Sequence, residues 1–249
     1  MMKLIVLGSG TCVPSLIRSS PGYYLEADGC QVLVDCGSGT IHQLERSGKS
    51  YKDIDAVFLT HKHPDHFADL MPLIHALLYT PKFNREKELL IVGPQGFKEY
   101  YNKAIDPILF SSDGFSVRII EIIDEFDFSP FHIRSTKTVH SDDSIAFRFE
   151  YNGKSLVFTG DADYDQGLVN FAENADLIVA DCSFPSNMKV IGHLSSIECG
   201  LIAQKSGVNK LLLSHIYPSD TSDTERVNEA KENFKGDVIL AEDLMEIII

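Results

Sequence analysis

The chain has few basic residues for its size. It contains 22 lysines and arginines against 36 aspartates and glutamates, which gives a net charge of −14 over 249 residues. Two divalent cations would offset only about four of these charges. A long polyanion is normally bound through many lysines and arginines. The charge therefore disfavours a partner of that kind, but it leaves open a small anion held directly on metal ions.

The chain also lacks paired cysteines and long apolar segments. Its five cysteines are scattered and form no C-x-x-C pair, which is typical of buried thiols in a reducing compartment. The N-terminal apolar run is too short for a signal peptide, and no apolar stretch approaches the ~20 residues that cross a membrane. We therefore expect a cytoplasmic protein without a membrane segment.

A dinucleotide site is disfavoured by a missing glycine. Gly8-Ser9-Gly10 follows the strand predicted over residues 3–7, but the third glycine of that motif is absent. Pro14 also prevents a helix from following at once.

One segment, residues 56–66, combines a short buried strand with a dense group of metal-binding side chains. Three histidines and an aspartate follow its apolar run within six residues. His61 and His63 are two residues apart, so on extended backbone their rings point to the same side. Pro64 keeps His63 out of the helical region, so the chain turns before the next two ligands. The segment can present two ligand pairs, which predicts two metal ions a few ångströms apart.

Other polar groups also stand directly after predicted strands. They are Thr60-His61, His140, Gly160-Asp161, Asp181 and Ser214-His215. Chemistry in open α/β proteins gathers at such strand ends. The candidate ligands are then His61, His63, His66, His140, His215, Asp65 and Asp161. Imidazole and carboxylate without thiolate suit zinc, and also manganese or iron. Asp161 is the natural bridge, because each of its oxygens can reach one ion.

The predicted strands and helices alternate without a linker. Residues 146–158 predict a hairpin whose turn is Asn152-Gly153. A helix is predicted to begin at Ser195 with a capping box and to end before Gly207. Another helix is predicted over residues 67–78.

Residues 60–66 resemble the T-H-x-H-x-D-H signature of the metallo-β-lactamase superfamily, and the resemblance runs from Leu4 to the C-terminus. It implies an α/β fold, the four-layer αββα metallo-β-lactamase sandwich, with a dinuclear site between the sheets. We expect one such domain, residues 1–249, made of two αβ halves. The resemblance implies one metal on His61, His63 and His140, the other on Asp65, His66 and His215, and Asp161 as the bridge. Asp161 disfavours the β-lactamases themselves, which often have cysteine there.

Three further segments, residues 7–15, 35–43 and 192–215, resemble motifs of ribonuclease Z. In that family the histidine matching His193 is not a ligand but assists phosphodiester cleavage. Ribonuclease Z carries a long basic arm for transfer RNA between the positions matching His140 and Asp161. Here a tight hairpin joins these positions. We therefore do not expect transfer RNA as a partner, and the chain is more similar to short relatives such as cyclic phosphodiesterases.

These observations predict a metal-dependent hydrolase that acts on small or cyclic phosphodiesters. Two divalent ions, zinc in the first place, would lower the pKa of a bridging water to near neutrality, and the resulting hydroxide would attack phosphorus. His193 and Asp65 are the predicted catalytic residues, with His193 as proton donor to the leaving oxygen. Ser183 and Ser195 are predicted to contact the substrate, Ser195 from a helix start that can face a phosphate.

Several alternatives stay open. Thioesterases and lactonases of the superfamily share the seven ligands but do not need His193, and a ribonuclease Z-like RNA endonuclease or a non-catalytic metal sensor would also keep them. Asp181 either orients a metal-bound histidine or takes part in catalysis. His42, His75 and His132 are predicted to be structural or surface residues. A homodimer is also left open.

Overall fold

The computed structural model describes residues 1–109, 114–122 and 124–249, and in these residues the strands form two seven-stranded sheets. The strands of the first sheet are β1 (Lys3–Gly8), β2 (Gly22–Ala27), β3 (Cys30–Cys36), β4 (Ala56–Phe58), β5 (Leu89–Gly93), β6 (Val117–Glu121) and β14 (Glu246–Ile248). Those of the second are β7 (Glu125–Phe128), β8 (Phe131–Lys137), β9 (Ile145–Tyr151), β10 (Lys154–Phe158), β11 (Leu177–Asp181), β12 (Lys210–Ser214) and β13 (Asp237–Leu240). Their orders are β14-β1-β2-β3-β4-β5-β6 and β13-β12-β11-β10-β9-β8-β7.

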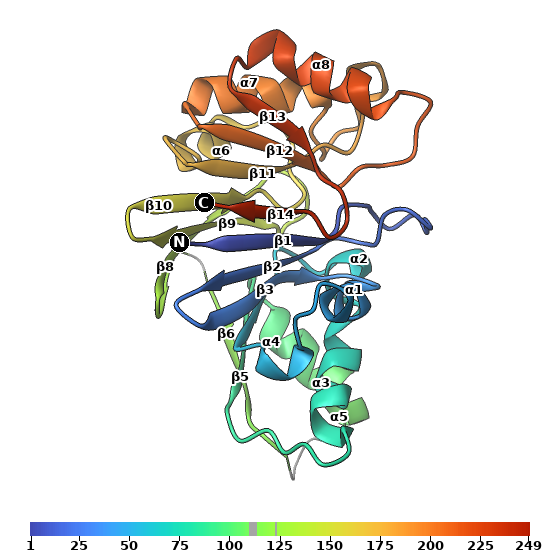
Figure 1. Cartoon of the computed structure of the whole chain (residues 1–249), viewed down its shortest axis with the longest axis vertical. Coiled ribbons are helices and arrows are strands. Elements are labelled where there is room, and N and C mark those ends of the chain that lie inside the picture. Colours follow the sequence, from blue (N-terminus) through green and yellow to red (C-terminus); the bar gives the residue numbers. More distant parts are fainter. Residues whose placement is uncertain (110–113, 123) are drawn as a thin grey trace.

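Helices cover the outer face of each sheet. They are α1 (Thr40–Arg46), α2 (Pro64–Phe67), α3 (Leu70–Tyr79), α4 (Phe97–Tyr100), α5 (Asp106–Leu109), α6 (Gln166–Phe171), α7 (Ser196–Ser206) and α8 (Asp223–Asn233). Figure 1 shows α7 and α8 at one end of the molecule and α1, α3 and α5 toward the other, with the strands between them. The two chain termini lie side by side, because β1 pairs with β14.

Three buried apolar clusters correspond to these layers. One joins side chains of both sheets, and its centre is Phe58, whose ring centroid lies 5.6 Å from that of Phe147 and 5.0 Å from that of Phe149. The second packs α1, α3 and α4 on the first sheet, and the third packs α6, α7 and α8 on the second. Burial of apolar surface on both faces of both sheets stabilises this arrangement. The predicted four-layer αββα sandwich is confirmed.

The strand directions bring the polar loops to one edge. β10, β11 and β12 are mutually parallel, and so are β3, β4 and β5. Parallel neighbours end at the same edge of a sheet. The ends of β10, β11 and β12 therefore bring together Asp161, Asp181 and His215. The ends of β3 and β4 bring together Asp35 and His61 in the same way.

The predicted hairpin and capped helix are confirmed. The helix predicted over residues 67–78 is confirmed over residues 70–78, but a break at Ala68 and Asp69 separates it from residue 67. Asn152 and Gly153 both have positive φ and connect β9 to β10, and Ser195 caps α7 with a complete capping box. The break places residue 67 at the end of α2 and residues 70–78 in α3. Pro72 is the reason, because it has no N–H for the carbonyl four residues earlier and its ring would clash there. It fits only in the first turn of a new helix. In the described part of the chain, none of the helices is long and apolar enough to span a bilayer.

Candidate metal centre

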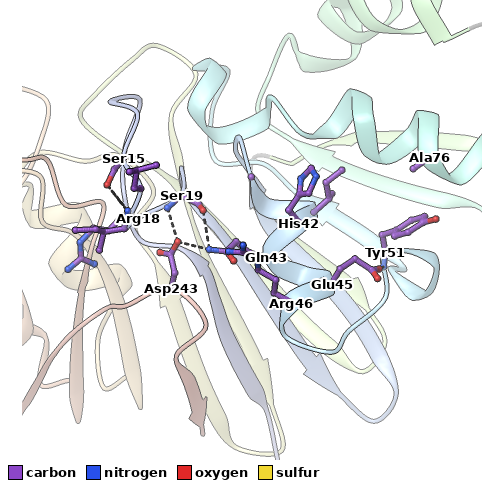
Figure 2. A pocket seen from close by; sticks show the side chains of 14 residues that line it. Ser15, Arg18, Ser19, His42, Gln43, Glu45, Arg46, Tyr51, Ala76 and Asp243 are labelled. Atoms are coloured by element: carbon purple, nitrogen blue, oxygen red, sulfur yellow. Dashed lines mark hydrogen bonds between the residues drawn. The ribbon is translucent and has the colours of Figure 1, made fainter.

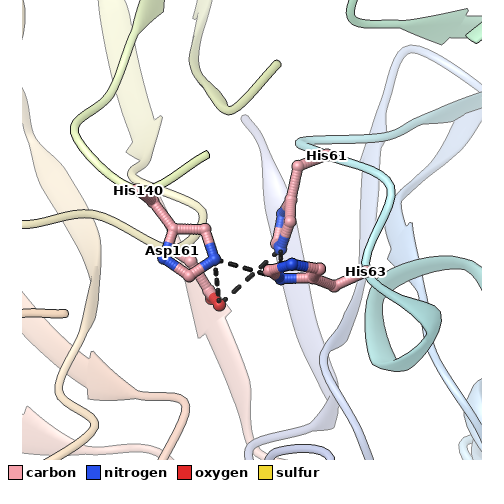
Figure 3. Close-up of side chains that lie close together, drawn as sticks. All are labelled: His61, His63, His140 and Asp161. Atoms are coloured by element: carbon pink, nitrogen blue, oxygen red, sulfur yellow. Dashed lines mark hydrogen bonds and ion pairs between the residues drawn. The ribbon is translucent and has the colours of Figure 1, made fainter. Parts of the chain in front are cut away.

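Three histidines and one carboxylate oxygen converge beyond the ends of β4, β8 and β10 (Figure 3). Nδ1 of His63 lies 2.9 Å from Nε2 of His61 and 3.0 Å from Nε2 of His140. Oδ2 of Asp161 lies 3.7 Å from Nε2 of His61 and 3.4 Å from that of His140. Ring nitrogens in this arrangement share a centre rather than each having its own acceptor, which is typical of a cation site.

The other oxygen of Asp161 faces a second group. Oδ1 lies 3.2 Å from Nε2 of His66 and 3.3 Å from Nε2 of His215. Oδ2 of Asp65 completes the group, at 3.8 Å from the first of these nitrogens and 3.6 Å from the second. All seven residues predicted as ligands therefore come together as two groups that share one carboxylate.

Glycine makes the shared carboxylate fit. Gly160 has φ +56°, and a Cβ atom on it would lie 2.7 Å from Cβ of Thr60. A larger residue would therefore separate the end of β10 from the loop after β4. The close approach of these two segments places Asp161 between the two histidine groups.

The second group has polar atoms that its own residues do not satisfy. Nε2 of His66, Oδ1 of Asp161 and Nε2 of His215 are buried, and the described residues give them no hydrogen-bond partner. Buried polar groups without partners are rare in native proteins. A cavity of about 20 Å³, which is room for one water, lies on the core side of these three residues, next to Tyr23 and Phe158. The donor set and these unsatisfied atoms fit a divalent cation.

The charges around the second group favour a cation as well. Burial by itself lowers the pKa of His66, but Asp161 and Asp35 raise it well above its ordinary value. Burial also lowers the pKa of His215, yet the negative charges of Asp161 and Asp181 raise it to about 10. The carboxylates thus attract positive charge to both rings. A divalent ion held there would replace those protons, so its binding would weaken as the pH falls.

Asp35 supports the second group from behind, a role that the strand pattern alone did not reveal. Its Oδ2 accepts a hydrogen bond from Nδ1 of His66 at 2.8 Å, and its Oδ1 accepts from the backbone N–H and the hydroxyl of Thr60. Its side chain is 2% exposed, and its φ of +56° is rare outside glycine. His215 has the same φ. Backbone strain of this kind is concentrated at functional sites.

Asp35→Asn should weaken metal binding by roughly 10–100-fold, because an amide cannot both accept from Thr60 and hold the Nδ1 proton of His66. Metal titration against a chelator measures the change. Asp55→Asn is the matched control, because Asp55 also accepts a backbone N–H across β3 and β4, but at their opposite ends. Equal affinities of the two variants would contradict a supporting role for Asp35.

His193 lies beside the metal groups and is bound to a different carboxylate. Its Nδ1 lies 2.9 Å from Oδ2 of Asp181 and 3.8 Å from Oδ2 of Asp161. Burial lowers its pKa, but the hydrogen bond to Asp181 and the charge of Asp161 raise it above the ordinary value. Because Asp181 occupies Nδ1, a proton for transfer would stand on Nε2. The side chain is 13% exposed, so part of it is open to a substrate.

The two serines predicted to contact substrate are engaged within the protein. The hydroxyl of Ser183 donates to Asp181 and lies 2.9 Å from Nδ1 of His215 and 3.1 Å from Nδ1 of His193. That of Ser195 donates to Glu198 in the cap of α7. Their contact with substrate stays a prediction. Ser183 instead joins the proton-donor candidate to a metal-ligand candidate.

A separate cavity of about 690 Å³ lies along α1 and the segment 15–19 (Figure 2). His42 lines it, in agreement with a position away from the metal groups. At its edge the carboxylate of Asp243 accepts from the backbone N–H of Ser19 and from the amide of Gln43. These bonds hold the N-terminal loop against α1.

Comparison with known proteins agrees with this architecture. Residues 31–216 match the model of the beta-lactamase superfamily domain. The chain is 30% identical to a probable metallo-hydrolase, YhfI, of Bacillus subtilis, over 96% of this chain and 97% of that protein. It is 27% identical to a ribonuclease Z of Thermoplasma volcanium, over 98% and 96% of the two chains.

The solved structures show the same relationship. The crystal structure of YhfI superposes with a TM-score of 0.87 at 29% identity, over 99% of this chain and 98% of that one. The short form of human tRNase Z superposes with a TM-score of 0.79 at 22% identity, over 99% of this chain and 99% of that one. The chain therefore belongs to the beta-lactamase superfamily and is a metal-dependent hydrolase with the metallo-beta-lactamase fold.

Proposed function

We propose that the protein is a phosphodiesterase that acts on small or cyclic phosphodiesters at a centre of two divalent ions. The observation that carries this proposal is the position of Asp161, whose two oxygens face two separate groups of histidines. One group would hold an ion with His61, His63 and His140, the other with Asp65, His66 and His215. Zinc suits these nitrogen and oxygen donors, as do manganese and iron.

Such ions would supply a nucleophilic water at neutral pH and positive charge for the phosphoryl oxygens. The chain's own residues would do the rest. Asp161 keeps the two sites close together, and Asp35 fixes the ring of His66. His193 donates a proton to the leaving oxygen, and Asp181 orients its ring and stabilises its charged form. Asp65 is predicted both as a metal ligand and as a catalytic residue. Because its carboxylate lies close to His66 and His215, we assign it to metal binding.

The Asp181–His193 pair favours a phosphodiester over a thioester. An alkoxide leaving from phosphorus needs a proton, because its conjugate acid is weak. A thiolate leaves without one. A histidine of raised pKa beside the metal groups, but bound to a carboxylate of its own, supplies such a proton.

Three observations favour a small substrate. The connection between β9 and β10 is the two-residue turn Asn152-Gly153, so a long arm is not inserted there. The alignment with the Thermoplasma ribonuclease Z runs over 298 positions, at least 49 more than the 249 residues of this chain. The net charge of −14 opposes an extended polyanion. The relatives named ribonuclease Z favour the second candidate, an RNA endonuclease.

A substrate panel separates these candidates. We expect metal-loaded protein to hydrolyse a bis-aryl phosphodiester and cyclic nucleotides, and to act at least tenfold less efficiently on thioesters and lactones, a difference of about 1.4 kcal/mol in the barrier. Precursor transfer RNA at ~150 mM salt should be bound weakly. Efficient 3′ processing of that RNA would favour the endonuclease. Preference for the thioester would overturn the phosphodiesterase proposal.

A further inference from the structure

Arg226, on the first turn of α8, is a buried cation among neutral partners. The residue is 1% exposed. Its Nη1 donates to the carbonyl oxygens of Cys182 and Ser183, and its Nη2 donates to the carbonyl oxygen of Tyr217 and the hydroxyl of Ser219. These bonds within the described residues all go to uncharged oxygens. Burying a charge without an opposite charge is costly, so we looked for a role of Arg226 that offsets this cost.

The carbonyls that Arg226 binds belong to the two loops that carry the proton-donor and ligand candidates. Cys182 and Ser183 follow Asp181 at the end of β11, and Tyr217 is two residues after His215 beyond β12. The two loops share only a few direct bonds, among them the one from the N–H of Tyr217 to the oxygen of Ser183, at 3.2 Å. The planar fork of one guanidinium fixes the spacing of both loops at once.

Ser183 transmits this spacing to the site. Its carbonyl binds Arg226, and its hydroxyl lies within hydrogen-bond distance of both His193 and His215. A shift of the Ser183 loop therefore moves the proton donor relative to the ring that faces Asp161. Misplacement of a reacting group by about 1 Å can lower a rate by about 10²-fold.

We propose that Arg226 is a positioning residue, which holds His193 at the distance from His215 that proton transfer to the leaving group requires. The inference rests on the proposed function, because it assigns His193 as the proton donor. It predicts an effect that depends on the leaving group. A residue that only stabilises the fold would change the rates of all substrates equally.

Arg85 offers a matched control. It is also buried, at 5% exposure, and also donates to backbone carbonyls, those of Lys52, Ile54, Lys87 and Glu88. These carbonyls lie near the starts of β4 and β5, at the opposite ends of those strands from His61. Arg85→Met should therefore lower the melting temperature without changing how the rate depends on the leaving group.

The experiment compares Arg226→Met and Arg85→Met in the full chain. For Arg226→Met we expect kcat on an alkyl phosphodiester to fall roughly 10–100-fold with KM within a few-fold, and a smaller loss on a nitrophenyl ester. Arg226→Lys keeps the charge but cannot span both loops, so it should lose less, in the same direction. It also provides the test if the methionine variant does not fold.

The visible spectrum of Co²⁺-loaded protein gives a reading that does not depend on activity. The bands should change in Arg226→Met, because His215 moves, and stay unchanged in Arg85→Met. If the wild-type protein hydrolyses no phosphodiester, the proposed function fails, while the spectra still test whether Arg226 positions the His215 loop. Unchanged spectra with equal losses on both leaving groups would overturn the inference.

Discussion

Asp161→Asn should release both metal ions together and lower hydrolysis roughly 10³-fold or more. Each oxygen of this carboxylate faces a different histidine group, Oδ1 toward His66 and His215, Oδ2 toward His61 and His140. Asparagine keeps the shape but removes the negative charge, and it turns an NH₂ group toward one of the two groups. Loss of two cations that polarise the phosphate and the water removes several kcal/mol of transition-state stabilisation.

The sharing of Asp161 makes this expectation specific. A ligand of one ion alone, such as His63 or His66, should on replacement weaken one ion more than the other. The bridging carboxylate should weaken both to a similar degree. Metal analysis of dialysed protein and titration with a chromophoric chelator measure the two affinities.

Asp142→Asn is the control for charge. Asp142 is exposed two residues beyond His140 and does not belong to the clustered residues, so the variant removes the same charge near the site without removing a candidate ligand. It should retain two ions per chain. An Asp161→Asn protein that also retains two ions, or that loses only one, would contradict the shared-carboxylate arrangement.

The candidate ligands could be predicted from the sequence because their positions follow from local rules. A strand that ends in a polar residue delivers that residue to the edge of its sheet, and parallel neighbours share an edge. Asp161 and His215 each follow such a strand. Four more candidate ligands lie within the seven residues of the T-H-x-H-x-D-H segment. They are close in the sequence, so no tertiary information is needed to predict that they are close in space.

Asp35 follows the strand-end rule only in part. It is the second-last residue of β3, beside β4, so the rule places it at the same edge of the sheet. Its contact with His66 depends on the path of the chain after Pro64, which folds back so that the ring returns to the end of β3. Sequence spacing does not give that direction.

Arg226 shows what only the tertiary structure gives. It lies in a charged helix, and the four residues before it are exposed. Its partners Cys182 and Ser183 are 44 and 43 residues away along the chain. Its burial results from the packing of α8 against the loops after β11 and β12. The break between α2 and α3, by contrast, can be predicted from the local sequence, because Pro72 lies within the segment.

His193→Ala should cut turnover of an alkyl phosphodiester by roughly 10²–10⁴-fold while leaving metal content and folding intact. The ring's Nδ1 is bound to Asp181. His193 also lies close enough to Asp161, Asp181 and His215 for the four to hold an ion together, but the seven ligand candidates form their two groups without it. Its removal therefore takes away a proton donor and no ligand. Substrate affinity should change much less than turnover, because the interaction strengthens in the transition state.

The leaving group decides between proton donation and a merely structural role. A nitrophenolate departs without protonation, so the loss on a nitrophenyl diester should be much smaller than the loss on an alkyl one. His75→Ala is the control, since His75 is exposed on α3 and its ring lies beside that of Tyr79, with the centroids 4.7 Å apart. Equal losses on both diesters would indicate positioning instead. If metal is lost with the ring, His193 is a ligand, because its Nδ1 also lies within 3.8 Å of Asp161, and the two groups would then have to be redrawn around it.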